Sequence, residues 1–61
     1  MNFRFKNSVS NLYVVECIPE TDTITLSKDA SKAYICADGD AELYKRKAEL
    51  MIGFQLEMEL C

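Results

Sequence analysis

Side chains able to perform catalytic chemistry are few in this chain of 61 residues. It contains no histidine, so it lacks the commonest general base and the commonest neutral metal ligand. The thiols of Cys17, Cys36 and Cys61 are the strongest nucleophiles that remain, and a thiol attacks only when a neighbouring base or positive charge helps to deprotonate it. Because no pair of cysteine and histidine can form, the composition argues against an enzyme, and we expect no catalytic residue.

The residues that could bind a metal ion do not have the required spacing. Cysteines that bind structural zinc usually come in pairs about two to four residues apart, and the three cysteines here are far more widely separated. Asp38, Asp40, Glu42 and Glu49 follow the spacing of a calcium-binding loop, but Leu43 occupies the position where such a loop needs a glycine. We therefore predict neither a metal site nor a bound cofactor.

The charge of the chain disfavours a nucleic-acid partner. Ten acidic side chains outnumber seven basic ones, which gives a formal net charge of −3, whereas neutralisation of phosphate supplies most of the affinity for nucleic acid. The only basic cluster is Lys45-Arg46-Lys47. Three consecutive helical residues point in different directions, so they do not form one basic patch.

The strongest structural pattern is an alternation of apolar and charged residues at both ends of the chain. It covers Phe3 to Lys6 near the start and Phe54 to Leu60 at the end, and such alternation is typical of half-buried strands. The basic residues of the first segment and the acidic residues of the second would complement each other across an antiparallel pair. One register satisfies every pairing at once: Phe3 with Leu60, Arg4 with Glu59, Phe5 with Met58, and Lys6 with Glu57.

The middle of the chain predicts a hairpin followed by an ambiguous segment. Residues 12–18 are rich in β-branched and aromatic side chains, and residues 23–27 alternate after a turn that begins at Pro19. Residues 28–38 fit a helix that is capped by Ser27 and ended by Gly39, or else a strand over residues 33–37. We favour the helix, because its alanines and lysines suit that structure and both of its ends have suitable capping residues.

A second helix is predicted from Asp40 until Gly53 ends it, with Ala41, Tyr44 and Ala48 on one face. The sequence thus predicts a single α+β domain over residues 1–61. Its small antiparallel sheet contains the N-terminal strand, the central hairpin and the C-terminal strand, and one or two helices pack on one face. The predicted core consists of the large apolar residues of these elements: Phe3, Phe5, Leu12, Val14, Val15, Ile18, Ile24, Leu26, Tyr34, Ile35, Tyr44, Leu50, Met51, Phe54, Leu56, Met58 and Leu60.

The order strand, helix, glycine turn and helix, which begins at Thr23, resembles the ribbon-helix-helix repressors. The resemblance covers about half of the chain and implies a dimer whose paired strand enters the major groove of DNA. Thr23, Thr25 and Ser27 would then contact the bases. A dimeric DNA-binding regulator is therefore the alternative function that the sequence suggests.

The leading functional expectation is a non-enzymatic module that binds another protein and acts as an inhibitor, adaptor or regulatory subunit. The strand of residues 12–18 is the most hydrophobic one available for pairing with a partner, and it contributes Tyr13, Val15 and Cys17 to the predicted contact. Tyr44 is predicted to join Tyr13 as an aromatic anchor. A homodimer is also expected, because a domain this small gains apolar burial from a second copy.

The expected location is the cytoplasm. An odd number of widely spaced cysteines is not a secreted disulfide framework, and the chain shows neither a signal peptide nor an apolar stretch long enough to span a membrane. Chains of this size are common among proteins that viruses and mobile elements encode, which suggests an action on host or defence machinery.

Overall fold

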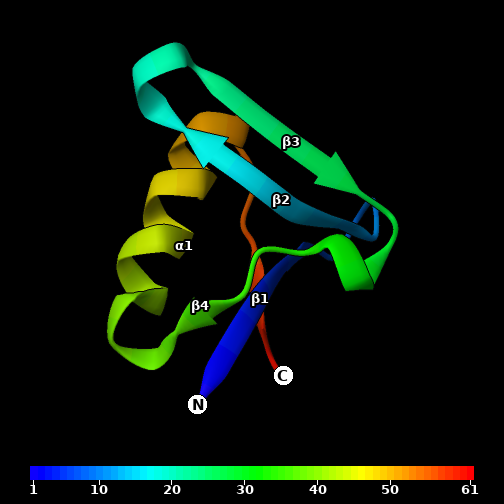
Figure 1. Ribbon diagram of the computed structural model, residues 1–61. Coiled ribbons are helices and arrows are strands. Elements are labelled where there is room, and N and C mark those ends of the chain that lie inside the picture. Colours follow the sequence, from blue (N-terminus) through cyan, green and yellow to red (C-terminus); the bar gives the residue numbers. More distant parts are fainter.

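The computed structural model describes residues 1–61 as a five-stranded antiparallel sheet with one α-helix packed on one face (Figure 1). The predicted α+β class is therefore confirmed. The strands are β1 (Asn2–Asn7), β2 (Leu12–Ile18), β3 (Thr23–Ser27), β4 (Cys36–Ala37) and β5 (Glu57–Leu60). The α-helix is α1 (Asp38–Ile52), and two short 3₁₀ helices, η1 (Pro19–Thr21) and η2 (Ala30–Lys32), lie within the connections.

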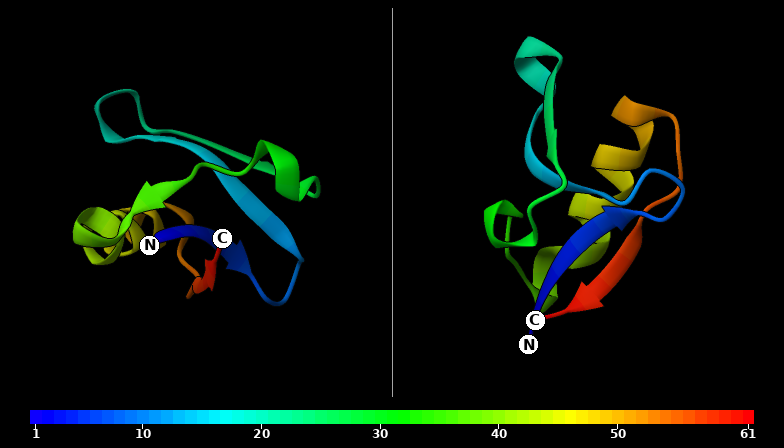
Figure 2. Two further views of the ribbon diagram at one scale, coloured as in Figure 1. Left: turned by 60° about the horizontal axis from the view of Figure 1, so that its bottom comes forward. Right: turned by 90° about the vertical axis from the view of Figure 1, so that its right-hand side faces the viewer.

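Strand β1 lies at the centre of the sheet and is paired on both edges. Strand β5 runs along one edge. The other edge is shared, because β2 pairs with Lys6 and Asn7 while β4 pairs with Asn2 and Phe3. Beyond this short pairing β2 diverges from β1, and the residues just before β4 run alongside β2. The two ends of the chain lie side by side in both views of Figure 2, and the amide of Cys61 donates to the carbonyl of Asn2 at 2.9 Å.

The register between β1 and β5 is the predicted one at all four positions. The ion pairs differ in one respect. Arg4 Nε lies 2.9 Å from Glu59 Oε1, as predicted, but Lys6 Nζ lies 3.3 Å from Glu59 Oε2 instead of pairing with Glu57. A long side chain reaches its diagonal neighbour across a strand pair, and Glu59 thereby accepts two cations while Glu57 stays exposed.

A polar cluster on the sheet face opposite to the core consists of Arg4, Lys6, Tyr13 and Glu59. Glu59 contacts each of the other three. The hydroxyl of Tyr13 donates to Glu59 Oε1 at 3.1 Å, and the Arg4 guanidinium lies 5.1 Å from the centre of the Tyr13 ring. The hydrogen bond from Arg4, with smaller contributions from Tyr13 and Lys6, lowers the pKa of Glu59. The cluster thus links β1, β2 and β5 on this face.

Reversal of the charge at Glu59 is expected to destabilise the fold more than reversal at Glu57. Glu59→Lys places a third positive charge beside Arg4 and Lys6, whereas Glu57→Lys changes a side chain without an ion pair. The double reversal should lower the urea midpoint, and addition of Arg4→Glu with Lys6→Glu should recover part of the loss. Equal effects of the two single variants, or no recovery in the quadruple variant, would contradict this view of the cluster.

The same cluster gives a pH dependence with a defined sign. Because the folded protein lowers the pKa of Glu59 below its ordinary value of 4.5, this carboxylate stabilises the fold above that pH. The contribution is lost as the pH falls through the lower folded value. The difference in urea midpoint between the wild type and Glu59→Gln should therefore be present at neutral pH and disappear in acid.

The helix predicted for residues 28–38 is wrong. The structure has only the single turn η2, where Asp29 Oδ1 accepts from the amide and the hydroxyl of Ser31 at 2.9 and 2.7 Å. The chain then becomes extended, and the amide of Tyr34 donates to the carbonyl of Val14 at 2.9 Å before Cys36 pairs with Phe3. The alternative of a strand is right for β4 alone. Long-range backbone bonding to β2 and β1 therefore outweighs the local preference for helix.

This correction changes the boundaries of the second helix as well. Helix α1 begins at Asp38, before the predicted Asp40, and no side chain caps it. Gly39, predicted to end the preceding helix, lies in the first turn of α1. Gly53 ends α1, as predicted, and is in the left-handed conformation at a φ of 76°. The order strand, helix, glycine turn and helix is therefore absent, and with it the basis of the resemblance to ribbon-helix-helix repressors.

The core is small and lies between the sheet and α1. Its buried members come from every layer of the fold: Phe5, Val14, Cys17, Cys36, Ala41, Ala48 and Leu56. The ring of Phe5 stacks on Tyr44 with centroids 5.2 Å apart, and Tyr44 stacks on Tyr34 at 4.6 Å. The buried face of α1 carries Ala41 and Ala48. These small side chains let the helix approach the sheet closely.

Five residues of the predicted core are exposed instead: Tyr34, Ile35, Leu50, Phe54 and Leu60. Leu50 is on the helix face that points away from Ala41 and Ala48, so it remains 81% exposed. Phe54 follows the turn at Gly53, which carries its side chain away from the core. The chain therefore has more exposed apolar surface than its pattern predicted.

Candidate functional site

An open groove with an apolar lining lies between the β2–β3 hairpin and the C-terminal end of α1. Its volume is about 420 Å³, and six of its eight lining residues are hydrophobic. The lining contains no charged side chain: Asn7, Val9, Ser10, Leu12, Ile24, Leu26, Ile52 and Phe54. The groove is therefore suited to an uncharged, apolar occupant.

Three separate stretches of the chain, 7–12, 24–26 and 52–54, place the lining residues. Alternation along β3 directs Ile24 and Leu26 to the same face, where they pack against the core. Ile52 is the last residue of α1, and the left-handed Gly53 sends the chain to Phe54, which is 62% exposed. Val9, in the turn between β1 and β2, also lines the groove and is 87% exposed.

The loop that carries Val9 is held by a buried side chain of β1. Asn7 is 6% exposed, and its Oδ1 accepts the amide of Val9 at 2.9 Å and that of Ser10 at 3.4 Å. These bonds fix the turn between β1 and β2. The exposure of Val9 is thus a property of a structured turn.

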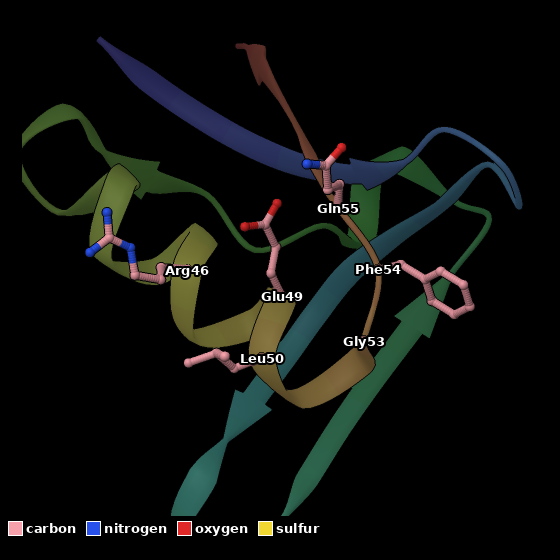
Figure 3. A pocket seen from close by; sticks show the side chains of 6 residues that line it. All are labelled: Arg46, Glu49, Leu50, Gly53, Phe54 and Gln55. Carbon is pink, nitrogen blue, oxygen red and sulfur yellow. The ribbon is translucent and has the colours of Figure 1, made fainter.

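A second hollow lies at the end of α1 and has a different chemical character. Its volume is about 340 Å³, and its lining includes the charged residues Arg46 and Glu49. Figure 3 shows the Phe54 ring turned away from Arg46 and Leu50. Glu49 Oε2 accepts the amide of Leu56 at 2.8 Å, so this carboxylate stabilises the turn after the helix.

A third hollow has a volume of about 250 Å³. Its lining includes the phenol of Tyr44 and the thiol of Cys36, which could act as nucleophiles only after losing a proton. Burial raises the pKa of Tyr44 to about 12 and also raises the pKa of the Cys36 thiol. Burial likewise raises the pKa of Cys17, whose Sγ donates to Met51 Sδ at 3.2 Å. These groups are protonated near neutral pH and are therefore poor nucleophiles.

Comparison with protein-family models, curated proteins and solved structures gives no match. No helix in the structure is long and apolar enough to cross a membrane.

The structure does not bring the four predicted contact residues together. Tyr13 is half-buried in the polar cluster around Glu59, and Val15 is half-buried at an irregularity in the β2–β3 register. Cys17 is only 9% exposed, and Tyr44 lies between two aromatic rings. Of the four, only Cys17 is buried, whereas Tyr13, Val15 and Tyr44 are half-buried.

Sequence reasoning did not find the groove. The alternation of Ile24 and Leu26 correctly predicts that both face the core. It does not show that α1 leaves part of this face uncovered. Val9 lies in a segment that reads as a polar loop. The position of Phe54 depends on the turn at Gly53, and no local pattern in the sequence shows where that turn points.

Proposed function

We propose that this chain is a non-enzymatic protein-binding module whose apolar groove receives an uncharged, hydrophobic segment of another protein. It would act as an inhibitor, adaptor or regulatory subunit. The observation that supports this proposal is the groove itself, with Val9 and Phe54 largely exposed at its sides.

The chemistry of the groove favours a protein segment with large apolar side chains. A volume of about 420 Å³ is within the range of sites that bind ligands, and exposed apolar surface beside such a site is typical of interaction surfaces. The lining offers hydrogen bonding only through Asn7, Ser10 and the backbone, and Asn7 already accepts two amides. Binding would therefore depend mainly on apolar burial.

We also propose that the protein works in the cytoplasm. Its three cysteines form no disulfide, and Cys17 and Cys36 are buried as small apolar side chains. Free thiols persist in reducing compartments, which supports this location.

The proposal can be tested by selecting random peptides that are displayed on phage against the purified protein. Selected peptides should be rich in leucine, isoleucine and phenylalanine. The double variant Val9→Glu with Phe54→Ser should weaken their binding by about tenfold or more, because apolar anchors dominate such contacts. Fluorescence anisotropy with the best labelled peptide measures this change.

Leu43→Glu is the matched control, since Leu43 is 71% exposed but does not line the groove. It should leave peptide affinity unchanged. The proposal would be contradicted if no peptide were enriched, or if the double variant bound as tightly as the wild type. Cosedimentation of the wild type, but not of the double variant, with phosphatidylcholine vesicles would instead identify a lipid-binding groove.

A further inference from the structure

We infer that the free edge of β3 pairs with β3 of a second copy of this chain, in antiparallel orientation about a two-fold axis through Thr25. This pairing would join two sheets into one. It uses the backbone edge of the hairpin, so it does not depend on what occupies the groove.

The outer edge of β3 has no partner within the chain. Strand β3 stands at one end of the strand order and bonds only to β2, and Figure 1 shows no element beyond it on that side. Its five residues, Thr23-Ile24-Thr25-Leu26-Ser27, include neither a charge nor a proline. Charges and prolines are the usual protection of an edge strand against pairing, so this edge is open.

The outer edge on the opposite side of the sheet is protected. Strand β5 bonds only to β1, and its four residues include Glu57 and Glu59. Pairing of two such strands would bring acidic residues of both copies close together, which destabilises a strand pair. The free edges of β3 and β5 therefore differ, and β4 has only two residues, so β3 is the strand best able to accept a second copy.

The residues around β3 are complementary to themselves in one register. With the axis through Thr25, Ile24 lies opposite Leu26 of the second copy, and Thr23 lies opposite Ser27. The same register places Asp22 opposite Lys28 of the second copy, and symmetry produces this pair of opposite charges twice. A shift by one residue would move the apolar residues out of alignment and separate the charges.

The two charged residues are available for this contact. The only ion pairs within the chain are those of Glu59 with Arg4 and Lys6, so Asp22 and Lys28 have none, and both are exposed. The backbone on either side of the strand is structured: the amide of Asp22 donates to the carbonyl of Pro19 at 3.1 Å, and the amide of Asp29 donates to Ser27 Oγ at 3.1 Å. Both charges are therefore held near the ends of β3.

Pairing at this edge would also enlarge the apolar surface. Ile24 and Leu26 line the groove, and in the proposed register they meet the same two residues of the second copy on the same face of the joined sheet. The two grooves would then lie on one side of a continuous sheet. A second copy thus adds apolar residues next to each groove.

The test uses two single variants and their mixture. Asp22→Lys leaves only lysines at the two positions, and Lys28→Asp leaves only aspartates, so each variant alone opposes like charges across the axis. Each should dimerise about tenfold or more weakly than the wild type. An equimolar mixture should restore dimers, because every lysine then faces an aspartate.

Sedimentation equilibrium over a range of protein concentrations measures this association. The wild type should approach twice its mass of 7.0 kDa as the concentration rises, and native mass spectrometry of the mixture should show the mixed dimer in excess over both homodimers. Circular dichroism establishes that each variant is folded. Lys28→Asp avoids a change at Asp22, whose φ of 52° suits few residues.

Glu42→Lys and Lys45→Asp on α1 are the matched controls, because they make the same changes of net charge away from β3. Both should dimerise like the wild type. A wild type that remains monomeric at millimolar concentration would overturn the inference. So would single variants that dimerise as well as the wild type, or a mixture that restores no dimer.

Discussion

Replacement of Phe5 by alanine is expected to leave the protein largely unfolded at room temperature. Phe5 is 0% exposed, stacks on Tyr44 and lies on β1, the strand that joins β5, β2 and β4. Removal of a buried phenylalanine side chain costs about 3–5 kcal/mol. A domain of 61 residues has a free energy of unfolding of only about 3–9 kcal/mol, so the loss is of the same size as the whole stability.

Phe54→Ala provides the matched control, since the same side chain is removed at a position that is 62% exposed. Urea titration followed by far-ultraviolet circular dichroism should show no folded baseline for Phe5→Ala and a midpoint close to the wild type for Phe54→Ala. A cooperative transition of nearly wild-type midpoint in Phe5→Ala would show that the core does not depend on this ring.

Replacement of Glu49 by alanine is expected to lower the free energy of unfolding by about 1–3 kcal/mol. Glu49 Oε2 accepts the amide of Leu56, a residue that is only 4% exposed, and the Glu49 carbonyl also accepts the amide of Gly53 at 2.9 Å. The side-chain truncation leaves the Leu56 amide without its acceptor. Alanine is a better helix former than glutamate, so a loss of stability cannot come from helix propensity.

Two controls separate the hydrogen bond from the charge and from the helix. Glu49→Gln keeps an acceptor oxygen and should retain much of the stability, and Glu42→Ala removes an exposed glutamate from the same helix at little cost. Hydrogen exchange of the Leu56 amide should be faster in Glu49→Ala than in Glu49→Gln. If Glu49→Ala matched Glu42→Ala in both measurements, the bond to Leu56 would have no structural role.

The parts of the fold that the sequence predicts are those with a pattern in their own side chains. The pairing of β1 with β5 follows from alternation and from opposite charges, which select one register. The β2–β3 hairpin is predicted equally well, because its two strands flank a short turn. The end of α1 is marked by Gly53, whose left-handed conformation only glycine adopts readily.

The segment before α1 shows why other parts could not be predicted. Its alanines and lysines favour a helix locally, but Tyr34 and Cys36 instead bond to the backbones of β2 and β1. These backbone groups are free to bond only because β2 diverges from β1 after two paired residues. The side chains of β1 and β2 contain no pattern that predicts this divergence. The groove could not be predicted for the same reason, since it is formed by three stretches of the chain that meet only in the folded protein.

The central position of β1 has a consequence for the order in which the fold can be completed. During synthesis β1 is made before the other strands, whereas β5, which pairs with Phe3 to Lys6 along one of its edges, is made after them. One side of the central strand therefore stays unpaired until the residues up to Leu60 have been added. A chain that is truncated before β5 retains the complete β2–β3 hairpin and α1 sequences, but it leaves a central strand with an open edge, which is the form most exposed to aggregation.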